Sequence, residues 1–263
     1  MTDALGPKNA LVQQARAVAR ERKEREATGL AHLEGIRLVE EALAADLPIE
    51  YLLYAADLAE RPRGRTLLEA IGQRSIPAYE VTPQALERAA DTQSPQGIVG
   101  LFRPRVRTLA DLGPGLVLLL DNLQDPGNLG TVIRSLEALG GGGAIVAGGV
   151  DPYNPKVVRG AMGSLFRLPV AKLELAEALD GLKGQGRKLY VADAGGDLLP
   201  WQADLAHGAA LIIGNEGAGP SPLSRQRADG VVSIPMEGPT ESLNAGVAAS
   251  LLIYEAMRQR GQR

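Results

Sequence analysis

Short apolar runs alternate with helix-like segments along most of this 263-residue chain, and this alternation restricts the possible folds more than any other feature. The clearest unit is 116–140, where an apolar run leads through Pro126-Gly127 into a segment with leucine, valine and isoleucine at helical spacing. A buried strand, a turn and a helix are expected there, with Asn128 as the helix N-cap. Strands that alternate with helices predict a parallel sheet covered on both faces.

The stretch from Arg103 to Gly115 breaks this periodicity, and it predicts a boundary between two domains. We expect an N-terminal domain at 1–103, a linker at 104–114 and a C-terminal domain at 115–263. The first part predicts a small α/β sandwich. Its expected elements are helices at 8–26, 36–45, 67–73 and 83–90 and strands at 32–35, 49–54, 76–81 and 98–102.

The second part continues the alternation through to a last helix at 243–260. In that helix Leu243, Val247, Leu251, Tyr254 and Met257 lie near one face. Asn154-Pro155 is typical of a helix start, with a cap followed by proline. The remaining expected strands are 144–147, 168–173, 188–193, 210–214 and 231–236, and a further helix is expected at 175–182.

The composition excludes several kinds of site. The chain has no cysteine and two histidines, so disulfides, thiolate zinc sites and a Ser-His-Asp triad lack their residues, and no metal is expected. Aromatic residues make up 3% of the chain, which disfavours base stacking as the main mode of RNA binding. No run approaches the about 18 apolar residues of a membrane-spanning helix. A soluble, cytoplasmic protein that does not enter membranes is expected.

Neither G-x-G-x-x-G nor the P-loop pattern occurs, which argues against a dehydrogenase-like enzyme and a P-loop NTPase. Three expected strand or helix ends carry glycine, small or polar residues instead: 213–217, 234–238 and 242–244. Such backbone-rich edges can hold an adenine without a glycine loop on phosphates. Structural roles remain open for single residues in and near them. Ser242 suits a helix N-cap, Glu216 a structural acceptor in a turn, and Arg134 a solvated surface charge.

Three motifs in order resemble the SpoU (TrmH) branch of the SPOUT RNA methyltransferases: N-L-G-T-V-I-R at 128–134, G-N-E-G-A-G at 214–219 and I-P-M-E-G-P-T-E-S-L-N at 234–244. The segment at 151–163 is also similar to family sequences. The N-terminal L-E-G-I-R-L-V-E-E-A-L at 33–43 resembles the small RNA-binding domain related to kink-turn-binding ribosomal proteins.

The resemblance implies ribose 2′-O-methylation of RNA by S-adenosylmethionine, in a catalytic domain that carries a trefoil knot and works as a homodimer. Pattern reasoning alone would not propose a knot, because threaded chains are almost absent from proteins. Where family sequences continue with Val-Ser, this chain has Ala245-Gly246, which predicts a looser helix start beside the cofactor. The implied active-site residues are Asn128, Arg134, Glu216, Ser242 and Asn244, and the implied cofactor contacts are Gly214, Ile234, Met236 and Leu243.

The RNA substrate is less sharply indicated. The resemblance of the N-terminal domain favours ribosomal RNA over transfer RNA, and a non-catalytic RNA-binding relative remains an alternative. With a net charge of -3, local arginine clusters must supply the phosphate contacts. The expected RNA-binding residues are Arg16, Arg20, Arg22, Arg103, Arg105 and Arg107.

Overall fold

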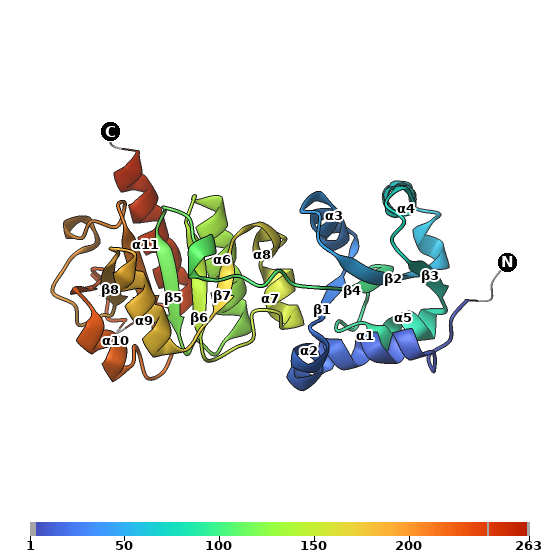
Figure 1. The fold of residues 1–263 in the computed structure, drawn as a ribbon, viewed down its shortest axis with the longest axis horizontal. Helices are drawn as coiled ribbons and strands as arrows, with labels where there is room; N and C mark the ends of the chain where they lie inside the picture. The colour runs from blue at the N-terminus through green and yellow to red at the C-terminus, as the bar shows by residue number, and fades with distance from the viewer. Residues whose placement is uncertain (1–3, 241, 262–263) are drawn as a thin grey trace. The chain divides into compact units, whose positions relative to one another are not determined.

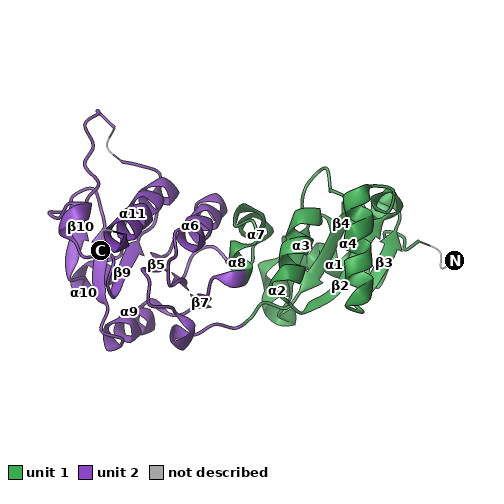
Figure 2. Ribbon diagram, turned by 90° about the horizontal axis from the view of Figure 1, so that it is seen from above, with its two compact units in different colours: residues 1–105, 153–166 green, residues 106–152, 167–263 purple. Residues whose placement is uncertain are grey.

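The computed structural model describes residues 4–240 and 242–261 and divides the chain into two compact units. The first unit comprises 1–105 and 153–166, and the second comprises 106–152 and 167–263 (Figure 2). The change of unit at 105–106 falls inside the predicted linker. The sequence pattern did not indicate that 153–166, which follows the strand at 143–147, packs with the N-terminal unit.

The first unit is a four-stranded mixed sheet in the order β1-β4-β2-β3, with helices on both faces (Figure 1). Successive side chains of β2 point to opposite faces, so Tyr51 and Leu53 pack with α1 and α5, while Leu52 packs with α3 and α4. This is the predicted α/β sandwich. Its elements are α1 (Ala10–Arg20), α2 (Arg22–Thr28), β1 (Ala31–Glu34), α3 (Ile36–Ala44), β2 (Ile49–Ala55), η1 (Ala56–Leu58), α4 (Pro62–Gln73), β3 (Ala78–Val81), α5 (Pro83–Ala89), β4 (Ile98–Phe102), α7 (Pro155–Gly160) and α8 (Ser164–Arg167).

Two expected helices differ from the prediction in this unit. The helix predicted at 8–26 is two helices, because Glu21 takes an extended conformation between α1 and α2. The helix predicted at 67–73 begins earlier, at Pro62, which occupies the first helical turn where its missing N–H costs nothing. The predicted cap and N1 proline at Thr82-Pro83 are confirmed.

The second unit is a six-stranded, fully parallel sheet in the order β10-β8-β9-β5-β6-β7. Both faces are covered, with α6 and α11 on one side and α9 on the other (Figure 2). The predicted parallel α/β class is therefore confirmed. Its elements are η2 (Leu109–Asp111), β5 (Val117–Asp121), α6 (Pro126–Ala138), β6 (Gly143–Ala147), β7 (Val170–Lys172), α9 (Leu175–Gly184), β8 (Lys188–Ala192), η3 (Pro200–Gln202), β9 (Ala209–Ile213), α10 (Pro222–Arg227), β10 (Gly230–Val232) and α11 (Ala245–Arg260).

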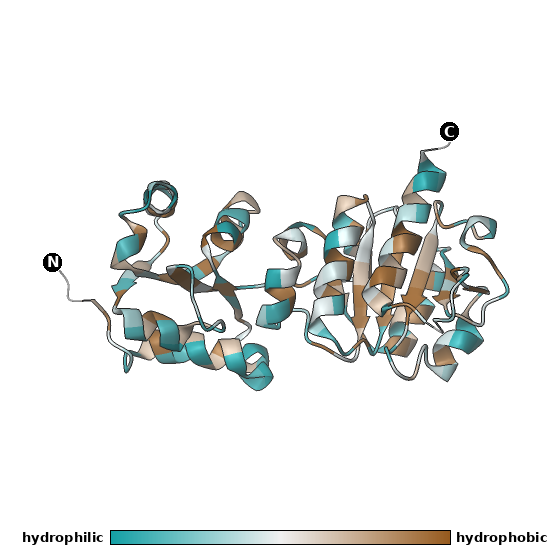
Figure 3. Cartoon of the chain, turned by 180° about the vertical axis from the view of Figure 1, so that it is seen from behind, coloured by the Kyte–Doolittle hydropathy of each residue, from teal (hydrophilic) through white to brown (hydrophobic). Residues whose placement is uncertain are grey.

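The central strands explain the apolar runs of the sequence. All five residues of β5 and all five of β9 are buried, as expected for strands packed on both faces (Figure 3). The last strand is shorter than the predicted 231–236. It ends at Val232, after which Ser233 donates to the Leu198 carbonyl, and Pro235 has no N–H to offer a further ladder bond. Ile234 and Met236 therefore lie in the loop after the sheet.

The last helix presents an unexpected face to solvent. Gly246, Ala249, Leu252, Ile253 and Ala256 are its buried residues. The apolar face noted in the sequence is exposed instead, and the exposed fractions of its members include 48% for Val247, 46% for Leu251 and 54% for Tyr254. No helix within 4–240 and 242–261 is both long and apolar enough to cross a membrane.

Candidate active site and cofactor cavity

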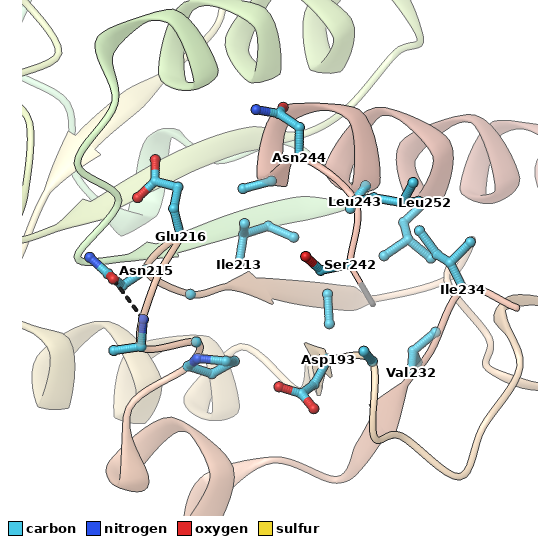
Figure 4. A pocket seen from close by; sticks show the side chains of 18 of the residues that line it. Asp193, Ile213, Asn215, Glu216, Val232, Ile234, Ser242, Leu243, Asn244 and Leu252 are labelled. Atoms are coloured by element: carbon cyan, nitrogen blue, oxygen red, sulfur yellow. Dashed lines mark hydrogen bonds between the residues drawn. The ribbon is translucent and has the colours of Figure 1, made fainter. Parts of the chain in front are cut away.

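A cavity of about 590 Å³ opens at the carboxyl ends of β8, β9 and β10 (Figure 4). Ligands of open α/β sheets bind at this edge, because the loops after parallel strands converge there with free backbone groups. All three glycine-containing or polar segments singled out in the sequence contribute to its lining. The predicted site residues among the lining are Gly214, Glu216, Ile234, Met236, Ser242, Leu243 and Asn244.

One part of the cavity wall is apolar. Val232, Ile234, Leu243 and Leu252 bring it together from β10, the loop that follows it and α11 (Figure 4). Gly214 allows the loop after β9 to fold tightly, since an added Cβ there would lie 2.2 Å from the backbone nitrogen of Pro220. This loop therefore requires glycine at position 214 to fold back so closely on itself.

The loop at 215–219 is fixed by its own hydrogen bonds. The side-chain oxygen of Asn215 accepts from the N–H groups of Gly217 and Ala218, each at 2.9 Å. The side-chain nitrogen of Asn215 donates to the carbonyl of Asn122, at the end of β5, at 3.1 Å. The loop therefore holds its shape and is tied to the next strand of the sheet.

Glu216 connects this loop to the start of α6. Its Oε1 accepts from the N–H of Asp125 at 2.9 Å and from Nδ2 of Asn128 at 3.0 Å, and its Oε2 accepts from the N–H of Gln124 at 3.0 Å. Partial burial raises the pKa of Glu216, but these hydrogen bonds, that from Asn128 first, outweigh it and hold the pKa below its usual range. Glu216 is therefore an ionised structural acceptor.

The prediction that Asn128 caps α6 is wrong. Asp125 is the N-cap, and its side chain accepts the N–H of Asn128 at 2.8 Å, with Pro126 in the first turn. Asn128 lies inside the helix, buried, with its amide directed to Glu216. The position of the proline decides this start, because its fixed φ suits the first helical residue and leaves the preceding aspartate as the cap.

Asn244, not Ser242 or Leu243, defines the start of α11. Its side-chain oxygen accepts from the N–H groups of Gly246 at 2.9 Å and Val247 at 3.1 Å. Gly246 is buried against α6, and a Cβ added to it would lie 3.3 Å from Oδ1 of Asn128. The glycine that departs from the family pattern therefore sits at the contact between the two helix starts.

Arg134 lies on the exposed side of α6, and it is not part of the cavity lining. Within the described part of the chain it makes no hydrogen bond or ion pair, so its guanidinium donors are available to another molecule. The structure thus joins Asn128 to the cavity through Glu216 and leaves Arg134 free on the same helix.

The SpoU rRNA methylase family matches residues 115–254, and an MRM3-like substrate binding domain matches residues 9–100. The chain belongs to the SpoU rRNA methylase family.

Relatives of this SpoU chain align over almost its whole length. It is 33% identical to the 23S rRNA (guanosine(2553)-2′-O)-methyltransferase of Bacillus subtilis, over 89% of this chain and 90% of that protein. It is 34% identical to the 23S rRNA (uridine(2479)-2′-O)-methyltransferase of Streptomyces viridochromogenes, over 96% of this chain and 91% of that protein.

Solved structures agree with the assignment. The SpoU methyltransferase AviRb from Streptomyces viridochromogenes, crystallised with AdoMet, superposes with a TM-score of 0.88 at 33% identity, covering 97% of this chain and 99% of that one. An AdoMet-bound rRNA methyltransferase from Sinorhizobium meliloti superposes with a TM-score of 0.87 at 28% identity, with 98% of each chain covered. The SpoU catalytic unit with an N-terminal substrate-binding domain is therefore the architecture of this chain.

The cavity suits S-adenosylmethionine. Its volume lies within the about 300–1,000 Å³ typical of small-molecule sites, and it combines an apolar wall with free backbone groups and charged side chains. The carboxylates of Asp193 and Glu216 and the guanidinium of Arg225 provide those charges. No group of histidine, cysteine, aspartate and glutamate suited to a metal ion occurs among the described residues.

The sequence reasoning missed Asp193 and Arg225. They form an ion pair, with 2.6 Å between a guanidinium nitrogen and a carboxylate oxygen. A signal for Asp193 was present, because an acidic residue closes the strand predicted at 188–193 and the ends of such strands carry ligand groups. Nothing in the sequence around α10 indicated Arg225.

The arginines predicted to bind RNA differ in their surroundings. Arg103 pairs with Glu50, and Arg105 donates to the carbonyls of Ala45 and Asp46 at the end of α3. Two more are paired through exposed carboxylates near them in sequence, Arg22 with Glu26 and Arg107 with Asp111.

Arg16 and Arg20 on α1 are the exceptions in this set. Neither has a polar side-chain partner within 4–240 and 242–261. Their charges are therefore the more available to phosphate, and the assignment of all six arginines stays a prediction.

Proposed function

We propose that this chain transfers the methyl group of S-adenosylmethionine to a ribose 2′-hydroxyl of ribosomal RNA. The observation that carries the proposal is the Glu216 carboxylate, which ties the cavity loop to the helix of Asn128 and Arg134. It brings together the first two of the three SpoU motifs. The relatives named above act on 23S rRNA, which supports rRNA as the substrate class.

S-adenosylmethionine supplies an activated methyl group on its sulfonium. The chain's own residues must hold the ribose hydroxyl in line and favour loss of its proton. Arg134 is an unsuitable base at neutral pH, because a guanidinium keeps its proton in proteins. It acts as a charged donor that holds the hydroxyl or an adjacent phosphate and stabilises the developing oxyanion. The proton leaves to phosphate or water.

Glu216 organises the site and is not its general base. Its carboxylate already accepts from Gln124, Asp125 and Asn128, and its lowered pKa leaves little tendency to take a proton. Asn128 keeps the start of α6 in register against the cavity loop. Asn244 does the same for α11 by capping it, and Ser242 adds a hydroxyl to the cavity wall.

The backbone edges and the apolar wall are assigned to the cofactor. Gly214 lets the loop after β9 fold tightly at the cavity edge, and Gly214, Ile234, Met236 and Leu243 line the cavity. The adenine would contact the apolar wall and hydrogen-bond to backbone groups, and no metal would be needed.

Two alternatives to rRNA methylation are a tRNA 2′-O-methyltransferase and a non-catalytic RNA-binding relative. Purified protein should be incubated with radiolabelled S-adenosylmethionine and transcripts of 23S rRNA or pooled tRNA. Label in the rRNA at a ribose 2′-oxygen supports the proposal. Label only in tRNA favours the first alternative. RNA binding without transfer to free rRNA or ribosomal subunits favours the second.

We also propose that the protein works as a homodimer. The exposed apolar face of α11, formed by Val247, Leu251 and Tyr254 and extended by Leu243 just before the helix, is a patch of the kind that soluble proteins cover with a partner. A second copy of the same face would cover it with matching apolar side chains around a two-fold axis. Light scattering at micromolar concentration tests this.

The trefoil knot of the family and a cytoplasmic location complete the proposal. After β10 at one edge of the sheet, the chain lines the cavity and α11 packs against α6. An experimental chain trace would test the knot. Fractionation of cells that express the tagged protein would test the location.

A further inference from the structure

Asp193 occupies a defined place in the cavity that the proposed function does not yet use. It follows β8 directly, and its backbone N–H donates to the carbonyl of Val232 at 3.0 Å. Figure 4 shows it next to Val232 and well away from Glu216. Its backbone therefore lies beside the apolar wall assigned to adenine, while its carboxylate lies near Gly219 of the cavity loop.

The Asp193 carboxylate is held in place but is not saturated. Oδ1 accepts from the N–H of Gly195 at 2.9 Å, and Oδ2 accepts from Arg225 at 2.6 Å. A carboxylate has about four lone-pair sites, so each oxygen keeps room for one more donor. Burial raises the pKa of Asp193, but the bond from Gly195 and the Arg225 guanidinium outweigh it, so the group is ionised at neutral pH.

The other carboxylate that lines the cavity offers no such capacity in its present geometry. Glu216 accepts three hydrogen bonds from the loop before α6 and from Asn128. Among the charged residues that line the cavity, Asp193 is therefore the acceptor with free sites on both oxygens.

We propose that Asp193 receives the 2′- and 3′-hydroxyls of the adenosine ribose of the cofactor, and that Arg225 is a positioning residue that aims this carboxylate. The inference rests on the proposed use of S-adenosylmethionine and names the residue that selects its ribose. Two adjacent acceptors match two adjacent hydroxyl donors. Carboxylates that follow a strand in this way hold ribose hydroxyls in dinucleotide-binding folds.

Two features favour the ribose over the ammonium group of the methionine end. Arg225 neutralises Asp193, which weakens its attraction for a cation but leaves its lone pairs available to neutral hydroxyls. The backbone bond to Val232 places residue 193 beside the wall assigned to adenine, and the ribose is the part of the cofactor directly bonded to adenine.

The competing structural role is to support the cavity loop. A Cβ built on Gly219 would lie 3.6 Å from an Arg225 nitrogen and 3.7 Å from a carboxylate oxygen of Asp193, so the ion pair packs beneath that loop. If the ion pair had only a structural role, its loss would lower the affinity for every ligand and the stability of the fold together. If Asp193 contacts the ribose, the loss of affinity depends on the hydroxyls that the ligand carries, and this difference defines the test.

The experiment measures calorimetric affinities of the full-length protein for three probes. These are S-adenosylhomocysteine, 5′-methylthioadenosine, which lacks the amino-acid end, and the 3′-deoxy form of 5′-methylthioadenosine. Asp193→Asn should weaken the first two alike, by about ten- to hundredfold, since it removes charge-assisted hydrogen bonds. Wild-type protein should bind 5′-methylthioadenosine more tightly than its 3′-deoxy form, and Asp193→Asn should largely lose that preference.

The matched control is Asp180→Asn. Asp180 pairs with Arg227 of the same helix α10 at the same 2.6 Å, but neither residue lines the cavity. This variant should bind every probe as wild type does. Arg225→Gln should weaken the ribose-bearing probes by up to about fivefold, the usual range for an exposed ion pair, and Arg225→Lys should restore most of it.

Four results would overturn the inference. If Asp193→Asn bound S-adenosylhomocysteine more weakly but bound 5′-methylthioadenosine with unchanged affinity, Asp193 would lie at the amino-acid end of the cofactor. If Asp193→Asn bound both ligands with unchanged affinity, only the structural role would remain. The same would follow if this variant still preferred 5′-methylthioadenosine over its 3′-deoxy form as strongly as wild type does. Wild-type protein that binds neither S-adenosylmethionine nor S-adenosylhomocysteine would refute the proposed function itself, and this inference with it.

Discussion

Replacing Glu216 by glutamine tests whether this carboxylate holds the active site together. Its oxygens accept three hydrogen bonds, two from backbone N–H groups of the loop before α6 and one from Asn128. Glutamine keeps one acceptor oxygen and turns an NH₂ group toward at least one donor. One charge-assisted bond is then lost, and because Glu216 is exposed, solvent screening reduces its contribution to about 1 kcal/mol. The free energy of unfolding should fall by about that amount.

The pH dependence gives a second measure of the same carboxylate. The pKa of Glu216 in the folded protein is below its ordinary value of 4.5, so its stabilising contribution is complete above pH 4.5 and is lost as the pH falls through the folded pKa. The stability difference between wild type and Glu216→Gln should be constant near neutral pH and shrink in acid.

Urea denaturation followed by circular dichroism and by Trp201 emission provides the assay. Trp201 is the single tryptophan and lies in the same unit as Glu216, so its signal reports the relevant transition. Glu237→Gln is the control, because Glu237 is exposed and the substitution makes the same change of charge. A Glu216→Gln variant within about 0.5 kcal/mol of wild type, the usual range for a surface substitution, would refute the structural role of Glu216.

Three further predictions concern catalysis, assembly and RNA. Arg134→Ala should slow methyl transfer by about 10²–10³-fold and Arg134→Lys should also be impaired, with calorimetric affinity for S-adenosylhomocysteine near wild type; near-normal transfer rates would contradict the assignment. Leu251→Asp should yield a monomer in light scattering, since it places a charge in the proposed interface, and a persisting dimer would locate that interface elsewhere. The logarithm of the RNA-binding constant falls with the logarithm of the salt concentration, and replacing Arg16 and Arg20 together by alanine should lower the magnitude of this slope by about 1.4, at about 0.7 per phosphate contact. Arg22→Ala should change the slope less, because Arg22 is paired with Glu26. A slope that is the same in the double variant and the wild type would place the RNA elsewhere.

The sheet was the most predictable part of the fold. Strands such as β5 and β9 are continuous apolar runs because both of their faces are buried, and the runs alternate with helices as a parallel sheet requires. The edge strand β10 was overestimated for the opposite reason. It pairs with β8 on one side and only with Leu198 on the other, so it ends at Val232, where the pairing with β8 ends, although the apolar character continues to Met236.

Helix starts were less predictable, because several residues near a start can cap it. Asp125 and Asn128 are both good N-caps, and the proline between them decides in favour of Asp125. The same ambiguity placed the start of α11 slightly early, at Leu243, although Asn244 is the residue whose side chain caps it.

The candidate site could be predicted as a set of motifs but not as a geometry. Glu216 and Asn128 are 88 residues apart, and no local pattern predicts that they share a hydrogen bond. The resemblance to SpoU methyltransferases supplied both residues, while the structure supplied the bond and the role of Glu216 that follows from it. Asp193 and Arg225 lie outside the motifs quoted for that resemblance, and only the folded sheet edge brings them to the cavity.

The start of α11 links three parts of the proposed mechanism. Asn244 caps the helix and lines the cavity, while Gly246 packs against Asn128 of α6. The adjacent turns carry Val247 and Leu251, whose exposed side chains form the proposed dimer face. Because one short stretch of helix meets the cofactor cavity, helix α6 and the proposed dimer face, loss of a dimer formed there would expose apolar surface beside the cavity. We therefore expect the proposed dimerisation to stabilise the helix start at the active site, and the Leu251→Asp variant should bind S-adenosylhomocysteine more weakly than wild type.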